Sequence, residues 1–315
     1  MTPIQYFFGI DIDQVHLTIA RSDQPGVVQI ANNSEAISAW LATLPENSAL
    51  AVESSGRCQR LLLALAVAAG RRIHLLNAYD VRRYAQGIGR RAKTDRVDAT
   101  VIARYLSREH DTLHLYQPPS NALATLEILL KRRAGVVQAQ TSLRQSLADL
   151  DELATPVQAL FQQFATLLAA LERRLIDVIA QDESTRRLYR HLGTIPGVGP
   201  IVGAVLVGVL ERLPQSSADA LVAFVGLDPR ADDSGARQGR RRLSKRGWPE
   251  ARRLLYLAAT TFARGALGKP LYQRYRQRGL STTASAVILA RKILRIAHAL
   301  RTHDCDFDPR RVAMA

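Results

Sequence analysis

Apolar and polar positions alternate through the first third of the chain in a pattern typical of an α/β layer. Short apolar runs at residues 7–12, 15–20 and 27–31 predict three consecutive strands joined by turns. Helix and strand patterns then follow in turn, at residues 34–44 with Ser34 as the helix cap, 50–53, 59–69 and 73–76. A meander followed by alternating helices and strands predicts a mixed sheet covered by helices.

The rest of the chain is predicted to be mainly helical. Pro156 divides residues 121–192 into two long runs in which apolar residues recur every three to four positions. This pattern predicts an antiparallel helical arm or coiled coil, and two helices of a bundle core fit the periodicity equally well. Further helices are predicted at residues 201–210, 254–264 and 284–301. We therefore expect three parts, at residues 1–118, 119–190 and 191–315.

The amino-acid composition limits the classes of function that are possible. The 315 residues, 47% of them apolar, suffice for about two domains with cores of their own. Lys and Arg total 43 against 28 Asp and Glu, and the net charge of +15 predicts a polyanionic partner, most commonly DNA or RNA. The two cysteines and seven scattered histidines exclude a disulfide framework and a zinc site of thiolate or HExxH type. Neither a signal peptide nor a bilayer-spanning stretch is recognisable, so we expect a cytoplasmic protein without membrane association.

Four carboxylates in the first part are candidates for catalysis. Asp11 lies inside an apolar strand, where an unpaired charge costs on the order of several kcal/mol, so a cationic group should face it. Glu53 ends the next buried strand, at the edge where α/β sites gather. Asp95 and Asp98 share one face of a helix that Thr94 can cap. Oxygen-rich groups of this kind hold paired Mg²⁺ ions for phosphodiester cleavage. The alternative for Asp95 and Asp98 is that they only stabilise the helix, through favourable contact with its dipole.

Two segments in the last part are candidates for phosphate binding. Gly197 and Gly199, in a Pro-Gly-Val-Gly-Pro turn, predict a helix-hairpin-helix element whose N–H groups point at a phosphate; a plain glycine-rich connection looks similar. Residues 229–247 form the most basic stretch, either a solvated loop or a phosphate-binding one, with six candidate cations: Arg230, Arg237, Arg240, Arg241, Arg242 and Lys245. Ser234 lies among them, where cations would activate its hydroxyl and stabilise a pentavalent phosphate, although serine before glycine is also common in turns.

Three other residues are weaker candidates. Asp13 shares a strand face with Asp11, but we expect it in solvent at the strand end. Ser244 is a second hydroxyl in the basic stretch, and Tyr256 lies in an apolar run typical of a core.

Taken together, these residues resemble the DEDD-type insertion-sequence transposases, the family of bridge-RNA-guided serine recombinases. The resemblance covers nearly the whole chain and rests on five motifs: Phe8-Gly9-Ile10-Asp11, Val52-Glu53-Ser54-Ser55-Gly56, Lys93-Thr94-Asp95-Arg96-Val97-Asp98-Ala99, Ile195-Pro196-Gly197-Val198-Gly199, and the block from Gly226-Leu227-Asp228-Pro229-Arg230 to Lys245-Arg246-Gly247. It implies an RNase H/RuvC-like fold for residues 1–118, in which four acids bind Mg²⁺: Asp11, Glu53, Asp95 and Asp98. It also implies a transposase domain at residues 191–315 with Ser234 as nucleophile.

The resemblance further implies a reaction and partners. Strand cleavage would pass through a covalent phosphoserine and be followed by exchange between a donor element end and target DNA. A noncoding bridge RNA and further copies of the chain, as a dimer or tetramer joined through the helical arm, would be partners. The RNA rests wholly on the resemblance, since no RNP-type or KH-type motif appears. Two alternatives stay open: a Holliday-junction-type nuclease in which water cleaves and Ser234 is structural, and a non-catalytic nucleic-acid-binding protein whose acids form ion pairs.

Overall fold

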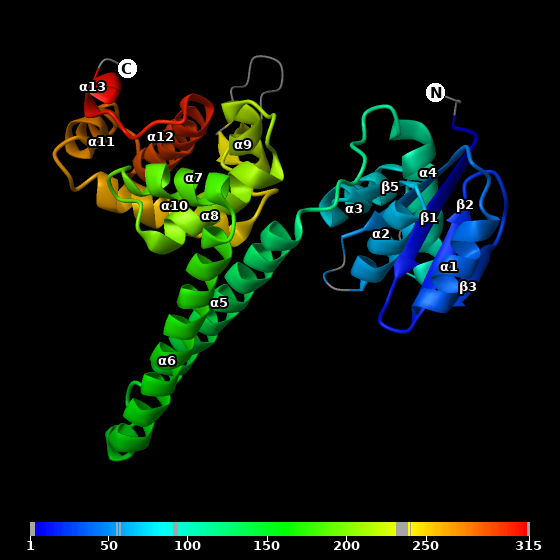
Figure 1. The fold of residues 1–315 in the computed structure, drawn as a ribbon, viewed down its shortest axis with the longest axis horizontal. Helices are drawn as coiled ribbons and strands as arrows, with labels where there is room; N and C mark the ends of the chain where they lie inside the picture. Colours follow the sequence, from blue (N-terminus) through cyan, green and yellow to red (C-terminus); the bar gives the residue numbers. More distant parts are fainter. Residues whose placement is uncertain are drawn as a thin grey trace. The chain divides into compact units, whose positions relative to one another are not determined.

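The computed structural model of the chain describes residues 4–54, 56, 58–90, 94–230, 239 and 241–313. Two compact units divide the chain, Met1–Pro118 and Pro119–Ala315 (Figure 1). The first unit is an α/β layer, and the described part of the second is helical except for a short two-stranded hairpin. Along the described residues, no helix combines the length and apolarity that crossing a bilayer requires.

A five-stranded mixed sheet forms the centre of the first unit. Its strands are β1 (Tyr6–Ile12), β2 (His16–Arg21), β3 (Val27–Ala31), β4 (Ser48–Glu53) and β5 (Arg72–Leu76). The order in space is β3-β2-β1-β4-β5, with β1, β2 and β3 antiparallel and with β4 and β5 parallel to β1. The sheet is therefore mixed, as the sequence predicts.

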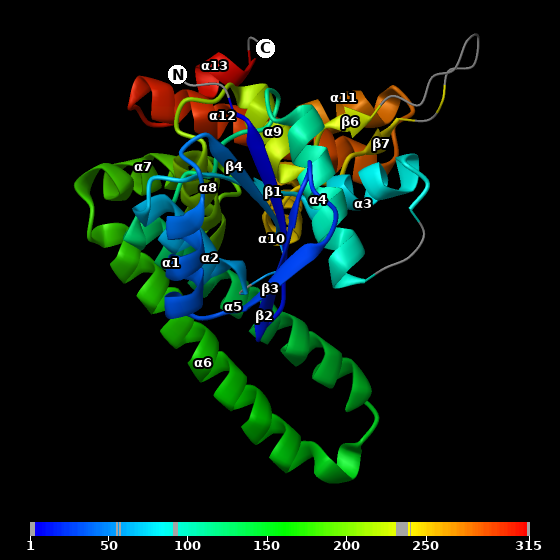
Figure 2. The same ribbon diagram turned by 90° about the vertical axis from the view of Figure 1, so that its right-hand side faces the viewer.

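Helices cover both faces of this sheet. They are α1 (Ser34–Thr43) and α2 (Gln59–Ala68) on one face and α3 (Ala78–Gly87) and α4 (Asp95–Glu109) on the other (Figure 2). The two-residue period of β4 explains this sorting, because Leu50 and Val52 pack with α1 and α2, and Ala49 and Ala51 pack with α4. The alanines are small, and they leave room for α4 to lie close to the sheet.

The predicted cap of α1 is one residue too late. Asn33, rather than Ser34, is the N-cap, and its side-chain oxygen accepts a hydrogen bond from the backbone N–H of Ala36 at 2.9 Å. Asn33 has the extended backbone that a cap requires, whereas Ser34 already belongs to the helix.

Two long helices project from the second unit as an arm, α5 (Asn121–Ser146) and α6 (Ala154–Ala180), which lie side by side (Figure 1). Arg133 Nε donates to Glu172 Oε1 across them at 2.7 Å. The break between the helices lies at residues 147–153 and includes the 3-10 turn η1 (Asp151–Leu153), so the prediction that Pro156 separates them is wrong. Pro156 lies in the first turn of α6, where its missing N–H would have no intrahelical partner.

The core of the second unit is built around α8 (Pro200–Arg212), whose residues 202–210 are all buried. The helices in this unit besides α8 and the arm are α7 (Glu183–Gly193), α9 (Ala218–Val225), α10 (Pro249–Phe262), α11 (Gly268–Gln277), α12 (Thr282–His303) and α13 (Pro309–Ala313). Leu126, Leu130 and Leu175, near the base of the arm, belong to the same core, while Leu160 and Leu167 further along are 40% and 48% exposed. The two interpretations of the leucine pattern thus each describe one part of the helical pair.

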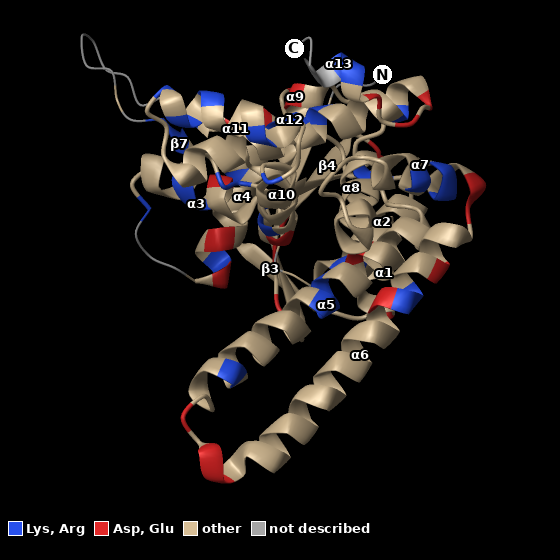
Figure 3. Ribbon diagram, turned by 90° about the vertical axis from the view of Figure 1, so that its left-hand side faces the viewer, with Lys and Arg blue, Asp and Glu red and all other residues tan. Residues whose placement is uncertain are grey.

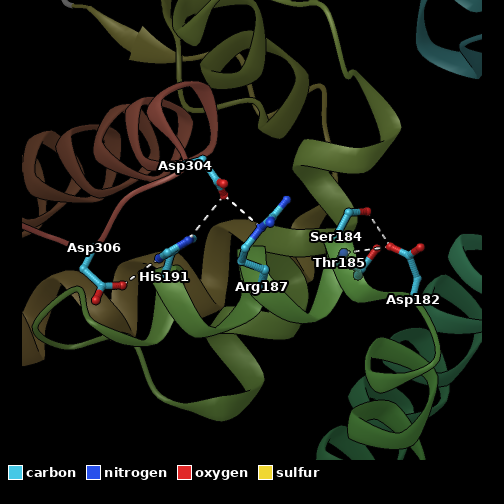
Figure 4. A network of polar contacts seen from close by, with 7 residues as sticks. All are labelled: Asp182, Ser184, Thr185, Arg187, His191, Asp304 and Asp306. Carbon is cyan, nitrogen blue, oxygen red and sulfur yellow. Dashed lines mark hydrogen bonds and ion pairs between the residues drawn. The ribbon is translucent and has the colours of Figure 1, made fainter.

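A polar network on α7 holds the last segment of the chain (Figure 4). His191 Nδ1 lies 2.6 Å from Asp306 Oδ1, and its Nε2 lies 3.4 Å from Asp304 Oδ1. Arg187 Nε lies 3.1 Å from the same Asp304 oxygen. These contacts tie α7 to the residues that follow α12.

At the other end of α7, we expect replacement of Asp182 to destabilise the second unit. Asp182 Oδ2 accepts hydrogen bonds from the Thr185 N–H at 2.7 Å and from the Ser184 hydroxyl at 2.5 Å (Figure 4). These donors lower the pKa of Asp182 from 3.8 to about 2. Loss of the cap in Asp182→Ala should cost about 1 kcal/mol in urea unfolding at neutral pH.

The pH dependence of this effect has a definite sign. Because the pKa is lower in the folded state, the ionised cap stabilises the unit above about pH 4, and this contribution is lost as the pH falls toward about 2. Asp182→Asn, an uncharged but competent cap, should keep most of the stability and lose this pH dependence. Equal stability of the alanine variant and the parent would contradict the assignment.

Candidate active site

Asp11 and Glu53 lie next to each other at the ends of neighbouring parallel strands. Ile10 of β1 pairs with Val52 of β4, so the residues that follow, Asp11 and Glu53, are adjacent at the carboxyl end of the sheet. By the two-residue period, Asp11 lies on the same face of β1 as Gly9, which is the face covered by α4. Both carboxylates are half-buried.

Close packing of α4 on β1 brings two further acids to this place. A Cβ atom on Gly9 would lie 2.0 Å from Ala103 N and 2.4 Å from Ala99 O, so only glycine allows the backbone of α4 to approach so closely. Thr94 caps the helix as predicted, and its hydroxyl accepts from the Val97 N–H at 3.3 Å. The first turn of α4, which contains Asp95 and Asp98, is thereby directed toward the end of β1.

The pKa of Asp11 reflects the nearness of the other acids. Its pKa is raised from 3.8 to about 6, first by burial and then by repulsion from Asp98, Asp95 and Glu53. The hydrogen bond with the Ile12 backbone acts in the opposite direction. The sequence predicts a cationic group facing Asp11, and this prediction is wrong for the described residues. The charges that shift the pKa of Asp11 there are those of the other three carboxylates. Asp11 therefore lies within electrostatic range of the other three acids that the sequence singles out.

The chemistry of these four side chains fits a hard divalent cation. Carboxylate oxygens are the ligands that Mg²⁺ prefers, and a nearby positive charge is what the half-buried Asp11 carboxylate, with its raised pKa, lacks. Within the described residues, no three Asp, Glu, His or Cys side chains stand close enough in this arrangement to hold one ion. Binding would require the carboxylates to turn toward a common point.

Asp13 lies in solvent at the end of β1, as expected. Its Oδ1 accepts hydrogen bonds from the backbone N–H groups of Val15 at 2.5 Å and of His16 at 2.7 Å, and these donors lower its pKa. The carboxylate therefore stabilises the turn between β1 and β2.

The basic stretch of the second unit begins and ends in a hairpin. β6 (Pro229–Arg230) pairs with β7 (Arg242–Leu243), and Arg230 lies opposite Arg242. Both of these arginines, Arg241 and Lys245 are exposed, so four of the six predicted cations lie at the surface around the hairpin. Ser234, Arg237 and Arg240 lie outside the described residues.

The two ends of this stretch are clamped together below the hairpin. Arg252 on α10 donates from Nη1 to Val225 O at 3.0 Å and to Gly247 O at 2.6 Å. A Cβ atom on Gly247 would lie 1.9 Å from Phe224 O, so the two chain segments cross in backbone contact. Sequence reasoning missed Arg252, because its partners are backbone carbonyls and nothing in the pattern separates it from the other arginines.

Ser244 and Tyr256 have structural explanations. The Ser244 hydroxyl donates a hydrogen bond to Asp228 Oδ1, which links the residue after β7 to the residue before β6. Tyr256 packs half-buried against the core of the second unit, as expected.

The glycine turn connects α7 to α8. Gly197 has a φ of +87°, and a Cβ there would lie 2.6 Å from Ala258 O of α10, so packing alone requires glycine. Gly199 precedes α8 in open space, with Pro200 in the first turn. Phosphate binding by this turn stays a prediction.

The first unit thus combines a mixed sheet of the order β3-β2-β1-β4-β5 with acidic side chains at the end of its central strands. Residues 8–154 match the family model DEDD_Tnp_IS110, described as a transposase, and residues 189–275 match the model of the Transposase IS116/IS110/IS902 family. The chain therefore belongs to the IS110/IS116 family of transposases.

Curated relatives match over most of their length. The pilin gene-inverting protein of Moraxella bovis is 25% identical over 83% of this chain and 82% of its own. The insertion element IS116 uncharacterized 44.8 kDa protein of Streptomyces clavuligerus is 25% identical, covering 93% of each chain. Among solved structures, T. thermophilus RuvC in complex with Holliday junction substrate is 16% identical, with a TM-score of 0.29 over 36% of this chain and 99% of that chain.

Proposed function

We propose that this chain is a DNA transposase that cleaves and exchanges strands with a serine nucleophile and a Mg²⁺-binding acidic site. Its membership of a transposase family makes DNA the substrate class. The observation that carries the acidic half of the proposal is the gathering of Asp95, Asp98 and Glu53 around Asp11, whose pKa is raised to about 6 first by burial and then by these three charges. A net charge of +15 supports a polyanionic substrate.

The four acids have a defined role in this proposal. Asp11, Glu53, Asp95 and Asp98 hold Mg²⁺, which when bound stabilises the charge that develops on the scissile phosphate. Glu53 and Asp11, on adjacent strands, supply the rigid side of the site. Asp95 and Asp98, in the first turn of α4, supply the other side.

Ser234 would carry the covalent step. Its Oγ attacks the scissile phosphorus, the bond to one deoxyribose oxygen breaks, and that oxygen leaves with a proton as a free hydroxyl. A hydroxyl of the partner strand then attacks the phosphoserine, which forms the new phosphodiester and releases Ser234. The cations of the basic stretch balance the phosphate charge during both steps: Arg230, Arg237, Arg240, Arg241, Arg242 and Lys245.

Two kinds of partner complete the proposal. Resemblance to the bridge-RNA-guided recombinases supports a noncoding RNA guide, and sequencing the nucleic acid that copurifies with the protein tests it: a discrete transcript from the flanks of the gene is expected. Exposed Leu160 and Leu167 on the arm support an interface with further copies of the chain in a dimer or tetramer.

Replacement of Ser234 tests the covalent step. We expect Ser234→Ala to lose the protein–DNA adduct that the parent forms with a plasmid carrying the gene and its flanks, after denaturation in SDS. Ser244→Ala is the matched control, because this hydroxyl is already bonded to Asp228, and it should still form the adduct. Both variants should retain DNA affinity.

The other outcomes separate the competing functions. If Ser234→Ala still cleaves and the parent forms no adduct, water attacks the phosphate and the chain is a nuclease. If neither the parent nor any variant cleaves while DNA affinity is normal, the protein binds DNA without catalysis.

A further inference from the structure

Helix α3 begins at the edge of the sheet where the acids of β1 and β4 lie. In the parallel ladder of β4 and β5, Glu53 lies opposite Leu76, and the Ser54 N–H donates to the Leu76 carbonyl oxygen at 3.0 Å. Asn77 follows Leu76 and caps α3, because its Oδ1 accepts from the Tyr79 N–H at 2.9 Å. Tyr79 therefore lies in the first turn of α3, three residues after the partner of Glu53.

Packing determines which side of α3 is turned outward. Val81 is buried in the cluster between the sheet and α4, and Tyr84 and Ala85 pack against the same cluster. The rings of Tyr84 and of Tyr105 on α4 have their centroids 4.8 Å apart. One side of the helix is thus held by the core, and the opposite side faces solvent.

The outward side of α3 combines cations with an aromatic ring. It carries four exposed residues at a spacing of three to four positions, Tyr79, Arg82, Arg83 and Gln86. Among the Phe, Trp and Tyr residues that the structure describes, Tyr79 alone is exposed, at 41%. Arg83 Cζ lies 6.0 Å from the centre of the Tyr79 ring. Asp80, the acid of this helix, is half-buried at the margin of the face.

This basic face lies beside acidic positions. Figure 3 shows Lys and Arg on α3 and Asp and Glu at the start of α4, and the two helices are in contact. A nucleic-acid strand that brings a phosphate to the acids is repelled by their charge, and cations beside them offset this repulsion. Arg82 and Arg83 are placed to hold the flanking phosphates of such a strand.

The Tyr79 ring indicates what kind of strand binds here. An aromatic side chain stacks on a base only where the base presents its flat face, and a continuous duplex covers that face. Stacking accepts any base, and a guanidinium beside the ring adds a contact to the base and its phosphate. In strand exchange, bases leave one complementary strand before they pair with the next, so unpaired bases occur beside the reacting phosphate.

We infer that Tyr79 stacks on an unpaired DNA base next to the phosphate held by the acids, and that Arg82 and Arg83 bind the adjoining phosphates. The inference rests on the proposed function, because it takes DNA as the substrate and the acidic site as the place of the scissile phosphate. It does not depend on which group attacks that phosphate. Tyr79 binds the strand and takes no part in bond formation.

Two DNA duplexes of about two helical turns test the stacking. One carries an unpaired 2-aminopurine at its centre, and in the other the same base is paired. The full chain with Ser234→Ala should bind the first duplex about tenfold more tightly and quench its fluorescence, since one base–aromatic stack contributes this much. Chelator is present throughout, so that metal-dependent cleavage does not consume the probe.

Replacement of the ring separates stacking from other roles of Tyr79. Tyr79→Ala should bind the two duplexes equally and leave the probe unquenched. Tyr79→Phe keeps the ring, so it should keep both the preference and the quenching. Val28→Ala is the control, because Val28 is 59% exposed on β3, the edge strand farthest from β5, and its loss should change neither.

The salt dependence of binding tests the arginines. Each phosphate contact contributes about 0.9 to the slope of log affinity against log salt concentration, so Arg83→Gln should lower the slope by about one on both duplexes. Arg21→Gln is the matched control for the lost charge. Arg21 lies opposite Phe8 near the start of β1 and pairs with Asp23 at 2.6 Å, so this variant should keep the slope.

Every other result counts against the inference or against the function. Equal affinity of the parent for the two duplexes, an unchanged preference in Tyr79→Ala, or a lost preference in Tyr79→Phe overturns the stacking. An effect of Tyr79→Ala that is confined to single-stranded RNA overturns the choice of DNA. A parent that binds neither duplex overturns the proposed function itself, whereas a wrong nucleophile leaves all these results unchanged.

Discussion

Asp11→Asn is expected to abolish DNA cleavage and to stabilise the first unit when no divalent cation is present. In the folded protein the Asp11 carboxyl is half-buried and repelled by three other acids, and its pKa is about 6 instead of 3.8. Asparagine has nearly the same shape without the charge. The loss of a ligand should lower the cleavage rate on the order of a thousandfold, which corresponds to about 4 kcal/mol of transition-state stabilisation.

The sign of the stability change follows from linkage. A carboxyl whose pKa is higher in the folded than in the unfolded state binds more protons when folded, so stability falls as the pH rises from about 4 through about 6. The penalty is fully present at pH 7. Allowing for solvent screening of a partly exposed group, we expect Asp11→Asn to recover about 1–2 kcal/mol there.

Hydrogen exchange of β1 and β4 peptides in the full chain measures this effect locally. In chelator, the parent should lose protection between about pH 4 and 6, and Asp11→Asn should not. Added Mg²⁺ should protect the parent and leave the variant unchanged. Asp13→Asn is the control on the same strand, because Asp13 is exposed and bonded within its turn, and it should keep cleavage. A destabilised Asp11→Asn protein would show that a cation faces Asp11 after all.

Gly9→Val is expected to displace α4 from the sheet and to abolish DNA cleavage, although it replaces none of the four carboxylates. A Cβ atom on Gly9 would lie 2.0 Å from a backbone nitrogen and 2.4 Å from a backbone oxygen of α4, and backbone atoms cannot rotate away as side chains do. Valine adds two more methyl groups at the same place. Overpacking of this kind should cost about 3 kcal/mol, and it displaces the first turn of α4 with Asp95 and Asp98.

Urea unfolding followed by Trp40 fluorescence measures the cost in the first unit, since Trp40 packs edge-on against Phe8 with ring centroids 6.1 Å apart. Gly87→Ala is the matched control in the same unit: Gly87 ends α3, and nothing lies within 4 Å of a Cβ placed there. It should be close to neutral. Parent-like stability and cleavage in Gly9→Val would mean that α4 is free to shift outward, contrary to the packing described above.

Local patterns predicted the elements that have strong periodicity. All five strands of the sheet and the long helices were expected close to their observed positions, because alternation and three-to-four spacing report directly on which face is buried. Helices α3, α9, α11 and α13 were missed, because α3 and α11 are strongly polar and α9 and α13 are short. The second long run was expected to continue to residue 192, whereas the structure divides it into α6 and α7. The break before α6 was placed at Pro156, since proline usually ends a helix, yet the first turn of a helix tolerates it.

At the candidate site, too, local features could be predicted from the sequence and long-range contacts could not. Thr94 as a cap and Asp13 as a solvated strand end are local features, and both were predicted. Arg252 was not, because its role depends on the backbone carbonyls of Val225 and Gly247, which only the fold brings to it.

By itself, the sequence determined that Asp11 lies in a buried strand, that Glu53 ends another, and that Asp95 and Asp98 start one helix. It also determined that the buried charge of Asp11 needs a counterpart. Only the tertiary structure decided that its neighbours are three more carboxylates, because the parallel register of β1 with β4 and the contact of α4 with Gly9 bring them together. The local pattern of apolar residues determines which positions are buried. The sign of the charge around a buried group depends instead on which distant segments pack against each other.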